Sequence, residues 1–292
     1  MRILLTIAHF FKPDTGQHAS QRKDPRPRLQ ALTLNIAGLH QLFGQSQNVI
    51  SIAKHLTFPA NQTQAHELDI VVCTTPQDHL LAELSLPYHF YQHHVTQAEP
   101  MLLGFECQAV LRDCLGQYDY YCFLEDDLIL HDPWFFAKLS WFTQQAGDVC
   151  LLQPNRYEIS SHALVCKAYI DGDLSPKVTA PFQQVKEHAK IQGKVMSIPI
   201  TFHRALNPHS GCYFLNANQM AIWASQPYFL DRDTSFVGPL ESAASLGIMK
   251  TFRVYKPTPE QANFLEIQHF GTQFLDLIGK NVDLVSSKGS SV

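Results

Sequence analysis

The sequence lacks the features that mark several common classes of protein. No apolar run is long enough to span a membrane, and no small-residue cleavage site follows the opening segment MRILLTIAHFF. The seven cysteines include no C-x-x-C pair, so neither a zinc ribbon nor a disulfide framework is indicated. Basic residues are not in excess, because 22 Lys and Arg stand against 26 Asp and Glu. We therefore expect a cytoplasmic protein with reduced cysteines that does not act mainly by holding nucleic acid.

Phosphate-binding loops of the familiar kinds are also missing. Neither G-x-x-x-x-G-K-[ST] nor G-x-G-x-x-G follows the first apolar segment, which argues against a P-loop NTPase and against a dinucleotide-binding enzyme. The G-x-S-x-G elbow of many serine hydrolases is absent as well. What the chain does have is length and apolar content: 292 residues, 45% of them hydrophobic, are enough to bury a sizeable core.

Short apolar runs alternate with helical patterns through the first half of the chain. This alternation predicts an α/β fold with a mostly parallel sheet flanked by helices. The expected strands are 2–10, 68–75, 88–94 and 118–130, and the expected helices are 28–43, 78–84 and 101–116.

The second half shows mixed strands and turns with three further helical patterns. Asp132 and Pro133 are typical of a helix N-cap and first helical position before the pattern at 134–145. A strand running into a helix is predicted over 211–225, and a short helix over 238–249 that ends near Gly247. The tail 286–292 is small and polar, which predicts disorder.

Three carboxylates stand together where the predicted strand 118–130 leaves the core. Glu125, Asp126 and Asp127 follow the apolar run YYCFL directly. Adjacent carboxylates repel one another and resist burial, so they need a cation, hydrogen-bond donors or water nearby. A divalent ion such as Mg²⁺ or Mn²⁺ meets that need and often shares its oxygen ligands with a phosphate. The alternative is a strand that simply ends in a solvated acidic loop.

A helix, the segment DYYCFLEDDLIL and a further helix together resemble the region around the D-x-D motif of GT-A fold glycosyltransferases. The resemblance implies a metal that holds the diphosphate of a nucleotide-sugar donor. It implies donor contacts from Glu125, Asp126 and Asp127, with Asp127 as the main metal ligand and Glu125 facing the ribose. The motif here is E-D-D, so a glutamate stands at its first acidic position.

Two later segments are similar to other parts of the same family. GPLESAASLGI resembles the helix start that carries the general base of inverting enzymes, and Glu241 is the matching carboxylate. The positive end of a helix favours an ionised carboxylate, although a glutamate there can also serve only to complement the helix dipole. NFLEIQHFGTQF resembles the late segment whose histidine completes the metal site, so the resemblance implies His269 as second ligand to Mn²⁺ or Mg²⁺. Packing in the core is the other reading of His269.

The turn NPHSG precedes the predicted strand at 211. In GT-A enzymes a small-residue turn at a similar place lines the acceptor pocket, so the resemblance makes His209 and Ser210 acceptor contacts. The loop QHASQRKDPRPR carries Arg22, Lys23, Arg26 and Arg28. Its readings are contact with the donor diphosphate, an anionic acceptor or a peripheral membrane surface, or a solvated flexible loop, and the composition favours the last.

We therefore expect one catalytic domain over 1–285, with a nucleotide-sugar-binding half at 1–130 and an acceptor and catalytic half at 131–285. The expected activity is transfer of a sugar from a nucleotide-sugar to a glycan or other hydroxyl acceptor, with inversion. A sugar nucleotidyltransferase would use a related sheet and metal, but no glycine- and lysine-rich loop follows the first strand. A non-catalytic nucleotide- or glycan-binding protein on the same fold is the third reading.

Overall fold

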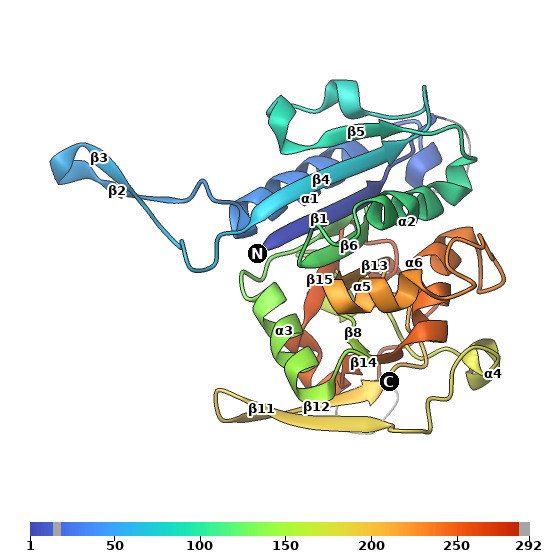
Figure 1. The fold of residues 1–292 in the computed structure, drawn as a ribbon. Coiled ribbons are helices and arrows are strands. Elements are labelled where there is room, and N and C mark those ends of the chain that lie inside the picture. The colour runs from blue at the N-terminus through green and yellow to red at the C-terminus, as the bar shows by residue number, and fades with distance from the viewer. Residues whose placement is uncertain (14–18, 286–292) are drawn as a thin grey trace.

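The computed structural model describes residues 1–13 and 19–285, drawn as a ribbon in Figure 1. The tail 286–292, for which disorder is predicted, lies outside the described residues. Within the described ranges, no helix combines the length and the apolar character needed to cross a bilayer.

A five-stranded sheet forms the centre of the molecule, in the order β13-β6-β1-β4-β5. Strand β1 pairs in parallel with β4 and β6, and β4 pairs in parallel with β5, whereas β13 runs antiparallel to β6. The predicted fold class, a mostly parallel sheet flanked by helices, is thereby confirmed. The strands span Arg2–Ala8 (β1), Glu67–Thr74 (β4), Gln92–Val95 (β5), Tyr120–Glu125 (β6) and Cys212–Asn216 (β13).

Side chains of β1 alternate between two apolar cores, because successive residues of a strand face opposite sides of the sheet. Ile3, Leu5 and Ile7 enter one core, which the apolar faces of α1 and α3 cover. Leu4 enters the other core, which α2, α5 and α6 cover. The helices span Arg26–Phe43 (α1), Leu103–Asp113 (α2), Phe135–Ala146 (α3), Pro176–Thr179 (α4), Ala217–Ala224 (α5) and Pro239–Thr251 (α6).

Two four-stranded sheets make up much of the second half, in the orders β10-β9-β15-β7 and β11-β12-β14-β8. Strand β7 directly follows the acidic residues and pairs antiparallel with β15, so that Leu128 lies opposite His269. This pairing brings β15, which lies late in the sequence, next to the acidic turn. The strands span Leu128–Ile129 (β7), Cys150–Leu152 (β8), Asn155–Ile159 (β9), Lys167–Tyr169 (β10), Lys190–Val195 (β11), Ile198–Arg204 (β12), Arg253–Pro257 (β14) and Glu266–His269 (β15).

A separate hairpin of β2 (Asn48–Ser51) and β3 (Leu56–Pro59) projects from the body of the molecule in Figure 1. It contributes no residue to the site described below. Short 3₁₀ turns connect many of the other elements, among them Leu81–Glu83, Tyr88–Phe90 and Pro100–Leu102.

Several predicted boundaries are wrong. The segment 78–84 holds only a 3₁₀ turn, and 88–94 is a 3₁₀ turn followed by β5. Helix α3 begins at Phe135 with Trp134 as its N-cap, and Asp132 accepts a hydrogen bond from the Trp134 amide at 2.9 Å. Helix α6 continues past Gly247 to Thr251. A Cβ at Gly247 would lie 2.7 Å from the indole nitrogen of Trp223, so this glycine allows close helix packing and does not end the helix.

Candidate active site

A cavity of ≈ 450 Å³ opens where β1 and β6 end. Ala8 and Glu125, the last residues of these strands, line it together with residues from α1, from the 3₁₀ turn Pro100–Leu102 and from α6. In open α/β sheets, ligands bind outside the carboxyl ends of the strands. The cavity therefore occupies the position where this fold class places its ligands.

Asp126 is the fully buried member of the acidic turn. Its Oδ2 lies 2.5 Å from Nδ1 of His9, and both side chains are excluded from solvent. Nε2 of His9 accepts a hydrogen bond from the Leu80 amide at 3.0 Å, so the proton of a neutral imidazole is on Nδ1 and is donated to Asp126. The other oxygen of Asp126 pairs with the guanidinium of Arg28. Asp126 thus anchors the turn and has little capacity left for a ligand.

Asp127 shares Arg28 with Asp126 but is less completely paired. Nη1 of Arg28 donates to Oδ2 of Asp127 at 2.7 Å. Burial opposes ionisation, yet the charges of Arg28, His269 and Arg156 together outweigh it and lower the pKa of Asp127. Oδ1 of Asp127 and Nε of Arg28 are both buried and have no hydrogen-bond partner within 1–13 and 19–285. The preferred reading of Arg28, as part of a solvated flexible loop, is wrong: its side chain is 16% exposed and projects from α1.

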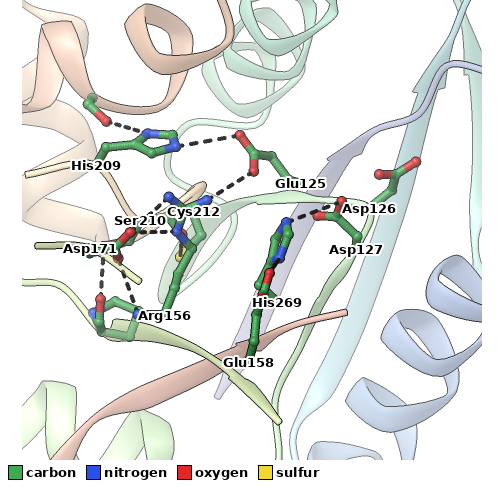
Figure 2. A network of polar contacts seen from close by, with 12 residues as sticks. Glu125, Asp126, Asp127, Arg156, Glu158, Asp171, His209, Ser210, Cys212 and His269 are labelled. Carbon is green, nitrogen blue, oxygen red and sulfur yellow. Dashed lines mark hydrogen bonds and ion pairs between the residues drawn. The ribbon is translucent and has the colours of Figure 1, made fainter. Parts of the chain in front are cut away.

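His269 faces Asp127 from β15, as Figure 2 shows. Its Nε2 lies 3.7 Å from Oδ2 of Asp127, and its Nδ1 lies 2.8 Å from Oε1 of Glu158. Oε2 of the buried Glu158 accepts the backbone amides of Phe274 and Leu275, which fixes the carboxylate. Burial disfavours the imidazolium, but the bond to Glu158 and the charge of Asp127 outweigh it and raise the pKa of His269. His269 is therefore held in one orientation with Nε2 directed at Asp127.

Glu125 points to the other side of the cavity (Figure 2). Its two oxygens lie 3.7 Å from Nη1 of Arg156 and 3.9 Å from Nε2 of His209. Burial is the main reason that the pKa of Glu125 rises to about 7, against the opposing charge of Arg156. Gly211 has a φ of +63°, and a Cβ there would lie 2.5 Å from a Glu125 oxygen. The glycine therefore makes room for the carboxylate.

A buried ionic group supports this second side. The Asp171 carboxylate accepts hydrogen bonds from Nε of Arg156 and from Nζ of Lys256, each at 2.9 Å. Lys256 also donates to the carbonyl of His209 at 2.7 Å. Burial opposes ionisation, but the two cations lower the pKa of Asp171 well below its usual value. Burial and the nearby Arg156 lower the pKa of His209 well below its usual value, which keeps this imidazole neutral.

The remaining predicted residues occupy different places. Glu241 lies in the first turn of α6, is half-buried and lines the cavity. His209 lines the cavity as well, with Nδ1 3.1 Å from the hydroxyl of Ser245. Ser210 is fully buried, and its hydroxyl donates to the carbonyl of Pro154 at 2.8 Å. The cavity thus brings together all the predicted site residues except Ser210, which lies behind its wall.

Asp127 and His269 together can occupy two coordination positions of a divalent metal ion. The unpartnered oxygen of Asp127 and the directed Nε2 of His269 are suitable ligand atoms, and a carboxylate behind a ligating histidine is how metal sites fix the ring. Within the described ranges, no three or more His, Cys, Asp or Glu side chains are arranged to hold a metal. Water and phosphate oxygens of a ligand would have to complete the coordination, as they do for Mg²⁺ at phosphate sites.

Comparison with known proteins gives no family. No protein-family model and no curated protein matches the chain. Among solved structures, a crystal structure of TarS from S. aureus aligns over 93% of this chain with a TM-score of 0.42 and 9% sequence identity. The chain spans 37% of that protein, so it corresponds to about a third of its length. A likeness of this size identifies neither a family nor an activity, and the site has to be interpreted from its own chemistry.

Sequence reasoning missed the charged residues that hold the site. Glu158 lies in β9, Asp171 follows β10, and Lys256 lies in β14. One available signal was a charged residue within an apolar run, which needs a partner if the run is buried. Lys256, 2% exposed in the strand RVYKP, is the clearest example.

Proposed function

We propose that this protein is a metal-dependent glycosyltransferase that moves a sugar from a nucleotide-sugar to an acceptor hydroxyl with inversion. The observation that carries the proposal is the placement of three groups on one cavity. Asp127 and His269 supply two directed metal-ligand atoms, and Glu241 supplies a half-buried carboxylate at a helix start. A nucleotide-sugar donor needs the first pair for its diphosphate, and an acceptor needs the third for its proton.

Asp127 and His269 would hold Mn²⁺ or Mg²⁺ together with the donor diphosphate. When bound, the metal neutralises charge that develops on the departing nucleoside diphosphate. The buried charges around the cavity agree with a cationic ligand. Besides Asp127, the acidic turn carries Asp126 and Glu125, and Arg28 is the cation that pairs with both aspartates. A structure with Mn²⁺ and nucleotide bound should place Nε2 of His269 in the coordination sphere, and a His269 packed far from the ion would contradict the assignment.

Glu241 would act as general base. As the acceptor oxygen forms its bond to the anomeric carbon, its proton moves to the Glu241 carboxylate and the bond from the anomeric carbon to the diphosphate oxygen breaks. Glu241 occupies the first turn of α6 and lines the cavity. The neutral His209 lies on the neighbouring wall, where it would contact a hydroxyl group of the acceptor, and Glu125 beside it would contact the ribose of the donor.

The test is a panel of nucleotide-sugars, each with Mn²⁺, measured first for thermal stabilisation and then for products. A ligand that binds only the folded state must raise its stability. We expect one donor class to stabilise the protein in a Mn²⁺-dependent manner and to release a nucleoside diphosphate when acceptors are supplied. Release of pyrophosphate would instead indicate a nucleotidyltransferase. Binding with no product over hours, across a broad acceptor set, would indicate a binding protein.

A further inference from the structure

Arg28 holds both aspartates of the acidic turn from the first turns of α1. Its guanidinium pairs with Asp126 through one terminal nitrogen and with Asp127 through the other, at 2.7 Å in the second case. The side chain is 16% exposed and lines the cavity. The carboxylate that would bind a metal therefore already has a cation on one of its oxygens.

Three buried polar atoms of this clamp have no hydrogen-bond partner in the described residues, and one of them, Oδ1 of Asp126, still lies against the Arg28 guanidinium in an ion pair. Among these residues, two atoms are left without any partner. Nε of Arg28 is a buried donor and Oδ1 of Asp127 is a buried acceptor, and neither has a partner in the described parts of the chain. A buried polar group without a partner is costly, so the unliganded pairing is not the best that these residues can form. A divalent cation would satisfy Oδ1, and a phosphate oxygen would satisfy Nε. The two missing partners are the two halves of a metal-diphosphate complex.

Electrostatics determines how the two halves interact. A divalent cation bound to Asp127 lies close to the Arg28 guanidinium, and like charges at short range in a partly buried site repel each other. A diphosphate that contacts both cations removes this repulsion and adds charge-assisted hydrogen bonds to the arginine. Binding of the divalent cation alone is therefore disfavoured, and binding of the cation together with the diphosphate is favoured.

We propose that Arg28 is a positioning residue that couples metal binding to diphosphate binding. Without ligands it holds Asp126 and Asp127 and opposes a free divalent ion. When metal and diphosphate arrive together, its unpartnered Nε donates to a phosphate oxygen while Oδ1 of Asp127 contacts the metal. This inference rests on the proposed function and adds to it that metal and donor enter the site cooperatively.

Arg156, the other arginine on the cavity, cannot take this part. Its Nε and Nη2 are both engaged by Asp171, at 2.9 and 2.8 Å. Arg26, two residues before Arg28 on the same helix, is exposed, and among the described residues it pairs only with Asp24. Arg26 is therefore a matched control for a change of charge on α1.

The experiment measures Mn²⁺ binding by the electron paramagnetic resonance signal of free Mn²⁺, with and without inorganic pyrophosphate. The complex that forms in protein-free buffer is subtracted. We expect pyrophosphate to tighten Mn²⁺ binding to the parent about tenfold or more, within the usual range of coupling between sites. Arg28→Gln should bind Mn²⁺ alone more tightly than the parent and reduce the coupling to within about threefold. Arg26→Gln should match the parent.

Two further variants separate the outcomes. Arg28→Lys keeps the charge and should keep most of the coupling, which guards against a loss caused by misfolding of Arg28→Gln. Asp127→Asn should bind Mn²⁺ poorly with or without pyrophosphate. If the parent binds Mn²⁺ cooperatively and Arg28→Gln shows the same coupling and the same affinity for Mn²⁺ alone, the inference is wrong while the proposed function stands. If the parent binds no Mn²⁺ under either condition, both are overturned.

Discussion

The cavity has two charged walls, which differ in how completely their charges are paired. The Asp127 wall consists of Asp126, Asp127, Arg28 and His269, and the Glu125 wall consists of Glu125, Arg156 and His209 with Asp171 and Lys256 behind them. On the Asp127 wall one arginine serves two aspartates, and two buried polar atoms are left without partners in the described residues. On the Glu125 wall, two cations, Arg156 and Lys256, surround Asp171, each in hydrogen-bond contact. The difference agrees with the proposal that a ligand completes the first wall, whereas the second is a fully paired ionic group that positions its neighbours.

The largest change in the free energy of unfolding is expected at the Glu125 wall. Asp171→Asn removes the counter-ion of two buried cations, and breaking a buried ion pair from one side costs about 3–5 kcal/mol of stability. Urea unfolding of the parent and the variant measures the difference. Asp173→Asn, two residues away and exposed, is the control and should stay within about 0.5 kcal/mol of the parent. An equal, small effect of both changes would remove the structural distinction between the walls.

The same wall predicts a dependence of stability on pH. Because the folded pKa of Asp171 is lowered, its contribution is present above the unfolded value of about 3.9 and is lost as pH falls toward the folded value. The parent should therefore lose stability below about pH 4 more steeply than Asp171→Asn. Unfolding curves between pH 3 and 6 test this, and parallel profiles of the two proteins would contradict it.

At Glu241 we expect a smaller change in the free energy of unfolding but a large change in the turnover rate. Glu241→Gln keeps the shape and loses the proton acceptor, so turnover should fall by roughly a hundredfold or more while donor binding survives. If Glu241 only complements the dipole of α6, the change costs at most about 1 kcal/mol of stability and leaves the rate nearly intact. Donor affinity, melting temperature and transfer rate on this variant separate the two roles. A rate within about threefold of the parent would place the base elsewhere or indicate a retaining enzyme.

Gly211 lies against the carboxylate of Glu125 and against Leu128, which follows the acidic turn. A Cβ at this position would lie 2.5 Å from a Glu125 oxygen and 3.1 Å from Cδ1 of Leu128, and the φ of +63° disfavours any other residue. Gly211→Ala should cost about 1–2 kcal/mol of stability, as expected for a strained backbone position. Gly172→Ala, with no atom near its added Cβ, is the control. An alanine at 211 that leaves stability and turnover unchanged would show that Glu125 is not held as described.

The smallest effect is expected at Ser210. Its hydroxyl donates to the Pro154 carbonyl and it is fully buried, so Ser210→Ala should lower stability by about 1 kcal/mol. We expect the KM for the acceptor to change by less than about twofold, because the hydroxyl faces the core. A large rise in that KM would restore Ser210 as an acceptor contact.

The fold could be predicted from the sequence where the pattern is local. The period of β1, the helix at 28–43 and the strand-to-helix step at 211–225 all follow from neighbouring residues. The start of α1 was misread because Pro25 and Pro27 resemble a loop, although proline is well tolerated in the first turn of a helix. That error placed Arg28 in solvent.

The site could be predicted only where a local sequence pattern indicates the chemistry of a residue. The acidic turn is recognisable because three carboxylates follow an apolar run. Glu158 and Asp171 carry no such local signal, and Lys256 shows only a charge within an apolar strand, because the roles of all three depend on pairings between segments far apart in the chain. Lys256 meets Asp171 from 85 residues away, and Glu158 meets His269 from 111 residues away.

The most direct test of the central claim is calorimetric binding of the product nucleoside diphosphate, with and without Mn²⁺, to the parent and to Asp127→Ala. Asp127 contacts Arg28 and faces His269, and our proposal places both the metal and the diphosphate at this residue. We predict Mn²⁺-dependent binding to the parent and loss of most of it in the variant, with circular dichroism showing that the fold is intact. Unchanged Mn²⁺-dependent affinity in Asp127→Ala would contradict the account.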